Sequence, residues 1–260
     1  MLRTLNTPYS GKYRRELKQK ITMKNKTLLR LFLTIMLALA LFSGCSSDRA
    51  GKLCEAIETG DNQKAVQIAK EMDSLDVQST AMPGLVSSFE GEVTTPLVKA
   101  CETGNKEMII WLLDHGASAD YAPGNILCPL EAFCESGSGA GLGAMQKLLD
   151  CGADPEEYKG IQPVFRLAGT LEHRDEKTVQ DGIDMVIMLL RNGAEWTNKI
   201  DGKTLLHYAA WQKDGTFMKS LLAMEEAKSF VNAKDYTGKT PKDIAEERGN
   251  QECVTLLQEK

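Results

Sequence analysis

The chain has 260 residues, of which 42% are hydrophobic and 26% are charged, and this globular composition excludes a wholly disordered or collagen-like chain. Residues 1–44 contain nine of the 31 Lys and Arg and one of the 36 Asp and Glu, which leaves 22 basic and 35 acidic residues, a net charge of −13, over residues 45–260. Such an excess of acid argues against binding to nucleic-acid phosphates and favours a basic partner, or simply solubility.

The first part of the chain has the features of a targeting signal. Residues 28–42 form an apolar run of 15 residues that only Arg30 interrupts, whereas a helix that spans a membrane needs about 20 apolar residues. Lys24 and Lys26 precede this run, and a short apolar segment behind basic residues is typical of a secretory signal peptide. We therefore expect export rather than a spanning helix.

The apolar run ends in Phe42-Ser43-Gly44-Cys45. This string resembles the lipobox of bacterial lipoproteins, although Phe42 stands where that family usually has Leu. The resemblance implies that Cys45 is lipidated and becomes the first residue of the mature protein, attached to a membrane without spanning it. Ser46 in place of Asp implies the outer membrane under the sorting rule of enteric bacteria, a rule that not every bacterium follows. The alternative is ordinary cleavage near Ser43, with an unmodified cysteine.

These features divide the chain into four parts. Residues 1–22 are longer and more basic than such signals need, so we interpret them as an upstream extension and expect translation to begin at Met23. The signal peptide then covers residues 23–44, a lipidated tether covers residues 45–52, and a repeat domain fills residues 53–260. We expect the mature protein in the bacterial cell envelope, with the outer membrane favoured over the inner one.

One pattern recurs five times after residue 94. Each copy opens with a Pro, or with Leu205 in the place of the Pro. These positions are residues 96, 129, 163, 205 and 241, and they lie 33, 34, 42 and 36 residues apart. The first copy reads Thr95-Pro96-Leu97 and continues to Trp111-Leu112-Leu113-Asp114-His115-Gly116-Ala117, and later copies repeat parts of these strings. A weaker sixth copy precedes them, with Leu53, Ala56, Gly60 and Asp61.

The period and these residues resemble the ankyrin repeat, whose period is 33 and whose signature is T-P-L-H-x-A. The resemblance covers residues 53–260. It implies an all-α solenoid of about five to six helix-turn-helix repeats, joined by hairpin loops. No single repeat buries enough surface alone, so stacked neighbours supply the core.

The signature residues have physical roles at the helix ends. A Thr before Pro can bond the backbone where the first helix of a repeat begins, and Pro fits the first helical turn. Glycine permits a left-handed backbone between the two helices and after the second. We assign these roles to Gly104, Gly137 and Gly249 between the helices, and to Gly116, Gly152 and Gly193 after them.

Three repeats depart from the pattern. The third has a glycine-rich stretch at 137–143, which we interpret as an inter-helix loop because it lacks the Lys and the strand of a phosphate-binding loop. The fourth inserts about ten residues near 171–180, including His173, and insertions of this kind map to loops on one face, sometimes a binding face. The fifth has no Gly after Leu221-Leu222, so we expect its second helix to extend towards Val231.

Catalytic and metal-binding motifs are not recognisable in the sequence. His207 is the signature His of its repeat, normally satisfied by local hydrogen bonds, and His115 and His173 fall in a helix-ending turn and a charged stretch. Neither an H-E-x-x-H string, a nucleophile elbow nor a dinucleotide motif is present. We therefore expect no enzyme, no metal and no cofactor, with an enzyme or a small-molecule site in the array as the weaker alternative.

The cysteine spacings do not match zinc sites, and we interpret the cysteines after Cys45 as small buried side chains. A bridge between Cys128 and Cys151 is the alternative, because both would lie at the same end of one repeat and the cell envelope permits disulfides. The cysteines concerned are Cys54, Cys101, Cys128, Cys134, Cys151 and Cys253.

The resemblance also locates a partner-binding face. In ankyrin repeats the hairpin loops and first helices line a concave face, and the positions five, four and two before the Pro and six and seven after it vary with the partner. Carried over, these positions are Tyr158, Lys159, Ile161, Ile200, Asp201, Lys203, Trp211, Gln212, Tyr236 and Lys239, with Thr94, Glu102 and Thr103 in the second repeat.

Large aromatic side chains occupy three of these positions that the consensus leaves polar, Tyr158, Trp211 and Tyr236. Tyr and Trp are over-represented among interface hot spots, so we expect a binding face centred on repeats four to six. The alternative is that each aromatic side chain packs on the neighbouring repeat. Trp196 is expected to be structural and Trp111 to lie in the core. The predicted contact set is Tyr158, Lys159, Ile200, Lys203, Trp211, Gln212 and Tyr236.

Two classes of function remain. The first is a non-catalytic interaction module, held to a membrane by its lipid, that binds another protein in the cell envelope; it could serve as a scaffold, or as an immunity or inhibitor protein that neutralises a toxin or an enzyme. The second is an enzyme or a ligand site within the array. We favour the first, as a monomer with an unidentified protein partner that we expect to be basic, and with no nucleic-acid partner. The fold alone does not decide between them.

Overall fold

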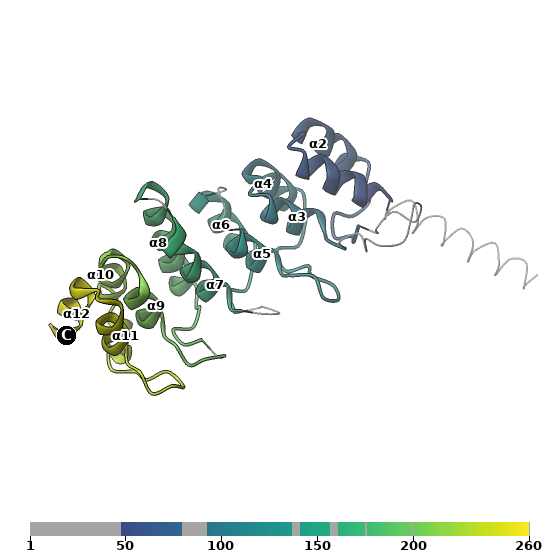
Figure 1. The fold of residues 1–260 in the computed structure, drawn as a ribbon. Helices are drawn as coiled ribbons and strands as arrows, with labels where there is room; N and C mark the ends of the chain where they lie inside the picture. The colour runs from purple at the N-terminus through teal and green to yellow at the C-terminus, as the bar shows by residue number, and fades with distance from the viewer. Residues whose placement is uncertain are drawn as a thin grey trace, which may run out of the picture. The chain divides into compact units, whose positions relative to one another are not determined.

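The computed structural model describes residues 48–79, 93–136, 141–156, 161–174, 176–198 and 200–259. Helices follow one another in pairs along this part of the chain (Figure 1). Helical residues 48–58 precede α2 (Asn62–Lys70). The later pairs are α3 (Pro96–Glu102) with α4 (Lys106–Asp114), α5 (Pro129–Glu135) with α6 (Gly141–Asp150), α7 (Pro163–Thr170) with α8 (Glu176–Arg191), α9 (Leu205–Trp211) with α10 (Thr216–Leu222), and α11 (Pro241–Arg248) with α12 (Gln251–Gln258).

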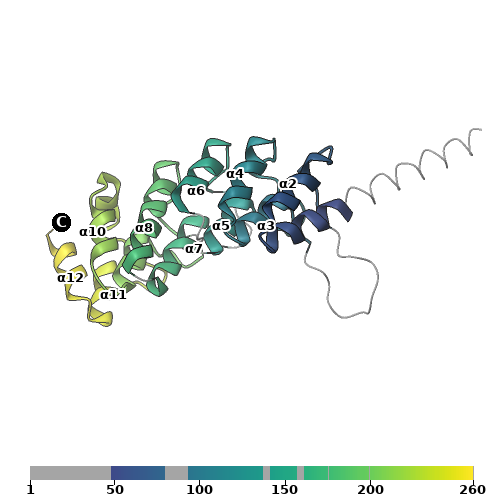
Figure 2. The ribbon, with the colours of Figure 1, turned by 90° about the horizontal axis from the view of Figure 1, so that it is seen from above.

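The helix pairs form two layers (Figure 2). The first helices α3, α5, α7, α9 and α11 pack on one another in chain order, and the second helices α4, α6, α8, α10 and α12 pack in the same order behind them. Among the residues described, the only strand-like pairing is an isolated bridge between Thr197 and Thr204. The predicted all-α solenoid of helix-turn-helix repeats is therefore confirmed.

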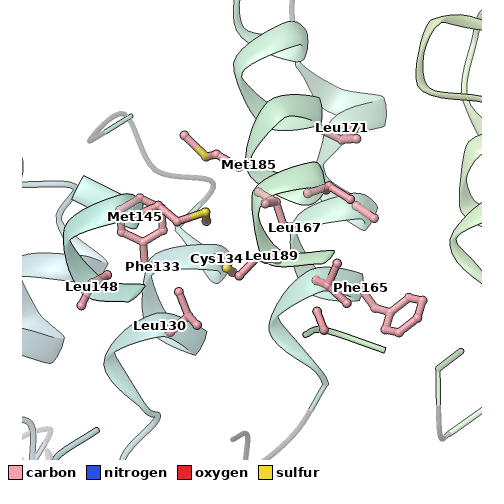
Figure 3. Packing of buried hydrophobic residues seen from close by; sticks show 14 of the residues in the cluster. Leu130, Phe133, Cys134, Met145, Leu148, Phe165, Leu167, Leu171, Met185 and Leu189 are labelled. Atoms are coloured by element: carbon pink, nitrogen blue, oxygen red, sulfur yellow. The ribbon is translucent and has the colours of Figure 1, made fainter. Parts of the chain in front are cut away.

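One continuous hydrophobic core runs from Leu53 to Leu257 between the two layers. Each repeat packs on the next, as Phe133 and Leu148 of the third repeat and Leu167 and Leu189 of the fourth illustrate (Figure 3). All four side chains are fully buried. Residues 47–260 form one compact unit, so the core that stabilises the repeats lies entirely within this unit.

Helix starts and turns follow from the signature residues. The Thr95 hydroxyl accepts a hydrogen bond from the Val98 N–H at 3.3 Å and so caps α3. Thr240 and Asp243 cap α11 reciprocally, as a capping box does. The predicted left-handed glycines have φ of 65° and 70° between helices and 93°, 95° and 101° after them, at Gly104, Gly249, Gly116, Gly152 and Gly193 respectively. Gly137 lies outside the described residues.

Two predicted boundaries are wrong. Residues 48–52, which we expected in the tether, are helical, and Ala50 is fully buried; the repeat domain begins at least this early because its first helix needs that turn for packing. The glycine-rich stretch is not a loop throughout, since Gly141, Leu142 and Gly143 form the first turn of α6.

Two further departures concern the insertions. The insertion in the fourth repeat is mostly helical: a short 3-10 helix, η1 (Leu171–His173), leads into the first turns of α8. In the fifth repeat α10 does not extend, because it ends at Leu222 and a separate 3-10 helix, η2 (Glu225–Phe230), fills the gap. Within the described ranges, no helix is both long enough and apolar enough to cross a membrane.

Candidate functional site

Large hydrophobic side chains are exposed on the loops and first helices of the last three repeats. The exposed fraction is 74% for Tyr236, 62% for Ile200, 44% for Trp211 and 37% for Ile161. Tyr208 is partly exposed and lies one turn before Trp211 on α9, on the same helix surface. We call these five residues the apolar face. Val93, at 46%, lies in the second repeat and is not part of it.

A tight hairpin presents Ile200. The Asn198 side chain accepts a hydrogen bond from the Ile200 N–H at 2.8 Å and donates one to the Tyr208 hydroxyl at 3.1 Å. The Gly202 N–H donates to the Asn198 carbonyl at 2.9 Å. Gly202 has a φ of +71°, which favours glycine. The hairpin is therefore fixed by its own side chains and by α9, and its tip leaves Ile200 exposed.

Tyr236 lies on the next hairpin and touches the previous one. Its N–H donates to the Asp201 carbonyl at 3.0 Å, and its ring lies so close to Gly202 that a Cβ there would be 2.5 Å from Cδ1. The ring thus packs on the neighbouring repeat, as the alternative interpretation held, yet 74% of the residue stays exposed. The hydrogen bond from the Tyr236 N–H to Asp201 holds the two hairpins together, and the absence of a Cβ at Gly202 leaves room for the Tyr236 ring.

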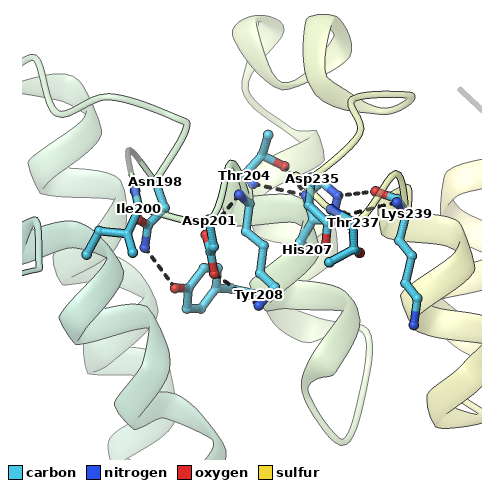
Figure 4. Close-up of polar contacts among 10 residues, drawn as sticks. Asn198, Ile200, Asp201, Thr204, His207, Tyr208, Asp235, Thr237 and Lys239 are labelled. Atoms are coloured by element: carbon cyan, nitrogen blue, oxygen red, sulfur yellow. Dashed lines mark hydrogen bonds and ion pairs between the residues drawn. The ribbon is translucent and has the colours of Figure 1, made fainter.

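His207 joins the fifth and sixth repeats (Figure 4). Its Nδ1 accepts from the Thr204 N–H at 2.9 Å, so Nε2 carries the proton and donates to the Lys239 carbonyl at 3.0 Å. Burial lowers the pKa of His207, because a charged ring is poorly solvated there. The predicted structural role of this histidine is therefore confirmed by its bonds.

Trp211 is held by two residues from other repeats. Its indole N–H donates to Glu172 Oε2 at 3.1 Å, and the same carboxylate pairs with Arg248 through Oε1 at 3.0 Å. The Arg248 guanidinium lies over the Trp211 ring, 4.1 Å from its centroid, a favourable cation–π geometry. The indole is thus oriented by residues that are 39 and 37 positions away in the sequence.

The insertion places Glu172 beside α9. Leu171 is buried and packs on α8 at Gly182, where a Cβ would come within 2.5 Å of the Leu171 side chain. Arg174 donates to the Thr170 hydroxyl and to the Thr178 carbonyl, both at 3.4 Å. Because η1 is fixed at both ends, Glu172 has a fixed position from which to bond Trp211.

The predicted contact residues differ in their exposure. Ile200, Trp211 and Tyr236 are exposed, and Lys203 is partly exposed and paired with Asp201 at 3.0 Å. Gln212 is buried, with 9% of the residue exposed, and its amide donates to the Tyr208 carbonyl, so it offers a partner little surface. The predicted residues that lie outside the described ranges are Cys45, Tyr158 and Lys159.

The earlier repeat offers less surface than its positions suggest. Thr94 is buried, and its N–H is bonded to Ser79. Glu102 pairs with Lys99 at 2.8 Å, and the Thr103 hydroxyl donates to the Lys99 carbonyl at 2.9 Å.

Sequence reasoning missed Tyr208, Glu172 and Arg248. Arg248 lies seven residues after Pro241, so the same positional rule applied to the last repeat would have found it. Glu172 had no such signal because it belongs to the insertion.

The other two tryptophans are structural, with one correction. Trp196 stacks on Phe230, with ring centroids 5.5 Å apart, as a semi-buried side chain should. Trp111 is only half-buried rather than in the core. It stacks on His115, with the two ring centroids 3.8 Å apart. The core side of that helix is filled instead by its neighbours Leu112 and Met108.

The cysteines of the described residues are thiols, and all except Cys151 are buried. The Cys128–Cys151 bridge is not formed, and Cys151 is exposed rather than buried. Burial raises the pKa of Cys54 and of Cys253 to about 12. It also raises the pKa of Cys101 and Cys134 well above the usual range. Across the described ranges, no group of three or more His, Cys, Asp or Glu is arranged to hold a metal ion.

Two family models of the ankyrin repeat match the sequence. One, described as ankyrin repeats (3 copies), matches residues 177–260, and one, described as ankyrin repeat, matches residues 94–122. These matches show that residues 94–122 and 177–260 contain ankyrin repeats, and the described part of the chain is an all-α solenoid of stacked helix pairs. Residues 123–176 lie between the matches and contain the glycine-rich stretch and the start of the insertion.

No curated protein has a significantly similar sequence. Among solved structures, a chain of the complex titled "Bd0816 Predatory Endopeptidase from Bdellovibrio bacteriovorus in complex with immunity protein Bd3460" is similar to this chain. The TM-score is 0.53 and the identity 22%, over 80% of this chain and 97% of that one. This likeness concerns the fold, which by itself does not specify a function.

Proposed function

We propose that this chain is a non-catalytic protein-binding module and that its partner contacts the apolar face. One observation carries the proposal: the chain's own contacts orient the Trp211 indole, place the Tyr236 ring against Gly202 and hold the hairpin that carries Ile200, and all three side chains stay exposed. Ile200, Trp211 and Tyr236 are each 44% exposed or more. Exposed Trp and Tyr are enriched among interface hot spots, and side chains that are fixed before binding lose less conformational entropy when a partner binds.

The bonding of the reactive side chains supports a non-catalytic role. Both ring nitrogens of His207 are bonded within the chain. The thiols of Cys54 and Cys253 have a pKa of about 12, so they are protonated near neutral pH, whereas the thiolate is the nucleophilic form. These groups are used to stabilise the repeats.

A crosslinking capture from envelope extracts tests the proposal. The bait is residues 46–260, which include the whole compact unit. We expect one protein to be captured by this bait and lost by the variant Ile200→Ala/Trp211→Ala/Tyr236→Ala. The matched control is Lys219→Ala/Glu226→Ala/Ser229→Ala, which changes one exposed position on α10 and two on η2. This variant should capture the same protein. Equal capture by both variants would contradict the proposal.

We also propose that Cys45 carries the lipid and holds the module in the cell envelope, with the outer membrane favoured. The lipobox-like string and the basic, apolar segment before it support this. Metabolic labelling with a palmitate analogue should mark the chain and should not mark Cys45→Ser; labelling of both would contradict the assignment.

An immunity or inhibitor role is a second candidate, favoured by the fold likeness to a chain of a complex between an endopeptidase and an immunity protein. Under this proposal the captured partner is an enzyme or a toxin, and a stoichiometric amount of the bait abolishes its activity. The triple variant should leave that activity intact. A partner whose activity is unchanged by saturating bait would favour the scaffold role.

A further inference from the structure

We propose that the partner presents an uncharged, apolar protein segment to the apolar face, rather than the basic surface that the net charge suggests. This inference rests on the proposed function and specifies the chemistry of the partner. Its basis is the charge around the face, which is balanced within the chain.

Six charged side chains around the apolar face form three ion pairs. Asp201 pairs with Lys203 at 3.0 Å, Lys239 with Glu247 at 2.7 Å and Arg248 with Glu172 at 3.0 Å. These three pairs carry no net charge.

Two further charged residues, Lys234 and Asp235, precede Tyr236, and their charges cancel. Lys234 is exposed, whereas Asp235 is buried and its carboxylate accepts hydrogen bonds from the Thr237 N–H and hydroxyl and from the Lys239 N–H. Burial disfavours the charged form of Asp235, but these hydrogen bonds outweigh it and lower the pKa of its carboxyl group. Asp235 is therefore occupied in forming its hairpin.

The acid excess of residues 45–260 lies elsewhere. The eight charged residues around the face sum to zero, so the net charge of −13 belongs to the rest of the repeat domain. Exposed acids that lie away from the face include Glu107, Asp150, Asp181 and Asp184. The eight residues at the face therefore offer a basic partner no complementary net charge.

Breaking the pairs at the face would gain a charged partner little. Exposed ion pairs contribute little, and a charge on the binding protein would have to compete with the counter-ion that this chain already provides. Burial of Ile200, Tyr236 and Trp211 stabilises a complex more, because it removes large apolar side chains from water. Recognition therefore depends on apolar contact.

The same balance argues against a lipid surface as the occupant. Peripheral proteins reach anionic leaflets through an excess of Lys and Arg beside their apolar residues. At this face the eight charged residues named above carry no net charge. An apolar segment of a protein fits both the exposed side chains and the absence of net charge.

Selection from a phage-displayed random peptide library on immobilised residues 46–260 tests the inference. We expect recovered peptides to be rich in aromatic and aliphatic residues and close to neutral. Their affinity should change less than about twofold between about 50 and about 500 mM NaCl, because screening acts on charges and not on apolar contact. The variant Ile200→Ala/Trp211→Ala/Tyr236→Ala should lose at least about tenfold in affinity.

The control variant Glu225→Gln/Lys228→Gln removes one exposed ion pair on η2, away from the apolar face, without changing the net charge and should keep its affinity within about twofold. Basic peptides whose binding weakens with salt and depends on the face would overturn this inference and leave the proposed function standing. Peptides that bind the triple variant equally would overturn both. A selection that enriches no peptide, or pelleting with phosphatidylglycerol vesicles that the triple variant loses, would overturn the apolar-segment inference alone.

Discussion

Arg166 shows how a single residue stabilises the junction between the third and fourth repeats. It lies 3.5 Å from the carboxylate of Glu131, which is fully buried, and 3.0 Å from that of the exposed Glu135. A charge removed from water needs a compensating charge or hydrogen bonds. The contact with Glu131 is thus the one that matters for stability, while the contact with Glu135 is screened by solvent.

The variants Arg166→Ala and Glu135→Ala should therefore differ. Arg166→Ala leaves Glu131 buried without its cation and should lower the free energy of unfolding by about 3 kcal/mol. Glu135→Ala removes only an exposed partner and should cost less than about 1 kcal/mol. Urea unfolding followed by circular dichroism measures both. Adding Glu131→Gln to Arg166→Ala should recover part of the loss, and a loss that is equal in the two single variants would argue against this account.

His207 makes stability depend on pH. Its pKa is lowered in the folded protein, so between that value and the ordinary pKa of about 6.5 the unfolded chain binds a proton that the folded protein does not. Stability is full above about pH 6.5 and falls as the pH drops through that value. The aspartates with lowered pKa act at more acidic pH, so this window belongs to the histidine.

Urea unfolding midpoints at about pH 7.5 and about pH 5.5 test this dependence. The wild-type midpoint should fall with pH, and the fall should be smaller in His207→Gln, which has no proton to take up in this range. Identical pH slopes in the two proteins would show that the network between Thr204, His207 and Lys239 does not set the dependence.

At the scale of the element, the hairpins carry Ile200 and Tyr236 of the apolar face. Two hairpin glycines have a left-handed backbone, and comparing them distinguishes the effect of backbone strain from the effect of a side-chain contact. Gly202 has a φ of +71° and the Tyr236 ring against it, whereas Gly238 has a φ of +85° and nothing within 4 Å of a Cβ. Both Gly→Ala variants should lose about 1 kcal/mol of stability from the backbone alone. Only Gly202→Ala should also displace the ring.

Nuclear Overhauser contacts between the Tyr236 ring and the residue at position 202 measure this displacement. They should be present in wild-type protein and in Gly238→Ala, and absent in Gly202→Ala. Retention of the contacts in Gly202→Ala would mean that the ring does not depend on the missing Cβ for its position.

The sequence predicts those parts of the repeats that depend on local chemistry. The Thr95 cap, the capping box of Thr240 and the left-handed glycines act over three or four residues, so the motif alone locates them. The contact of Trp211 with Glu172 and Arg248 joins segments 39 and 37 residues away, and Glu172 reaches it only because the insertion folds as η1. The repeat period does not predict this contact, because Glu172 belongs to the insertion. For the same reason the positional rule predicts Gln212 at the surface, although Tyr208 and Asn250 enclose it.

At the scale of the whole molecule, the first helix pair differs from the others because repeats stabilise one another only through neighbours. Within the described residues no repeat precedes this pair, so its own contacts matter for its stability. Ala50 is fully buried, and the Arg49 guanidinium donates to the Glu71 carbonyl at 2.8 Å. Residues 48–52 are therefore part of the folded array, although the repeat motif begins only at Leu53.

A chain that starts at residue 53 should be less stable than one that starts at residue 46. It loses the first turn of the helix, the burial of Ala50 and the bond from Arg49, together about 1 kcal/mol or more, and the remaining helical residues 53–58 are too few to be stable without packing. A chain that starts at residue 48 keeps these contacts and serves as the control. Urea unfolding should give equal midpoints for the chains that start at 46 and 48, and a lower one for the chain that starts at 53. If all three midpoints agree, the first turn contributes nothing and the array begins where its motif does.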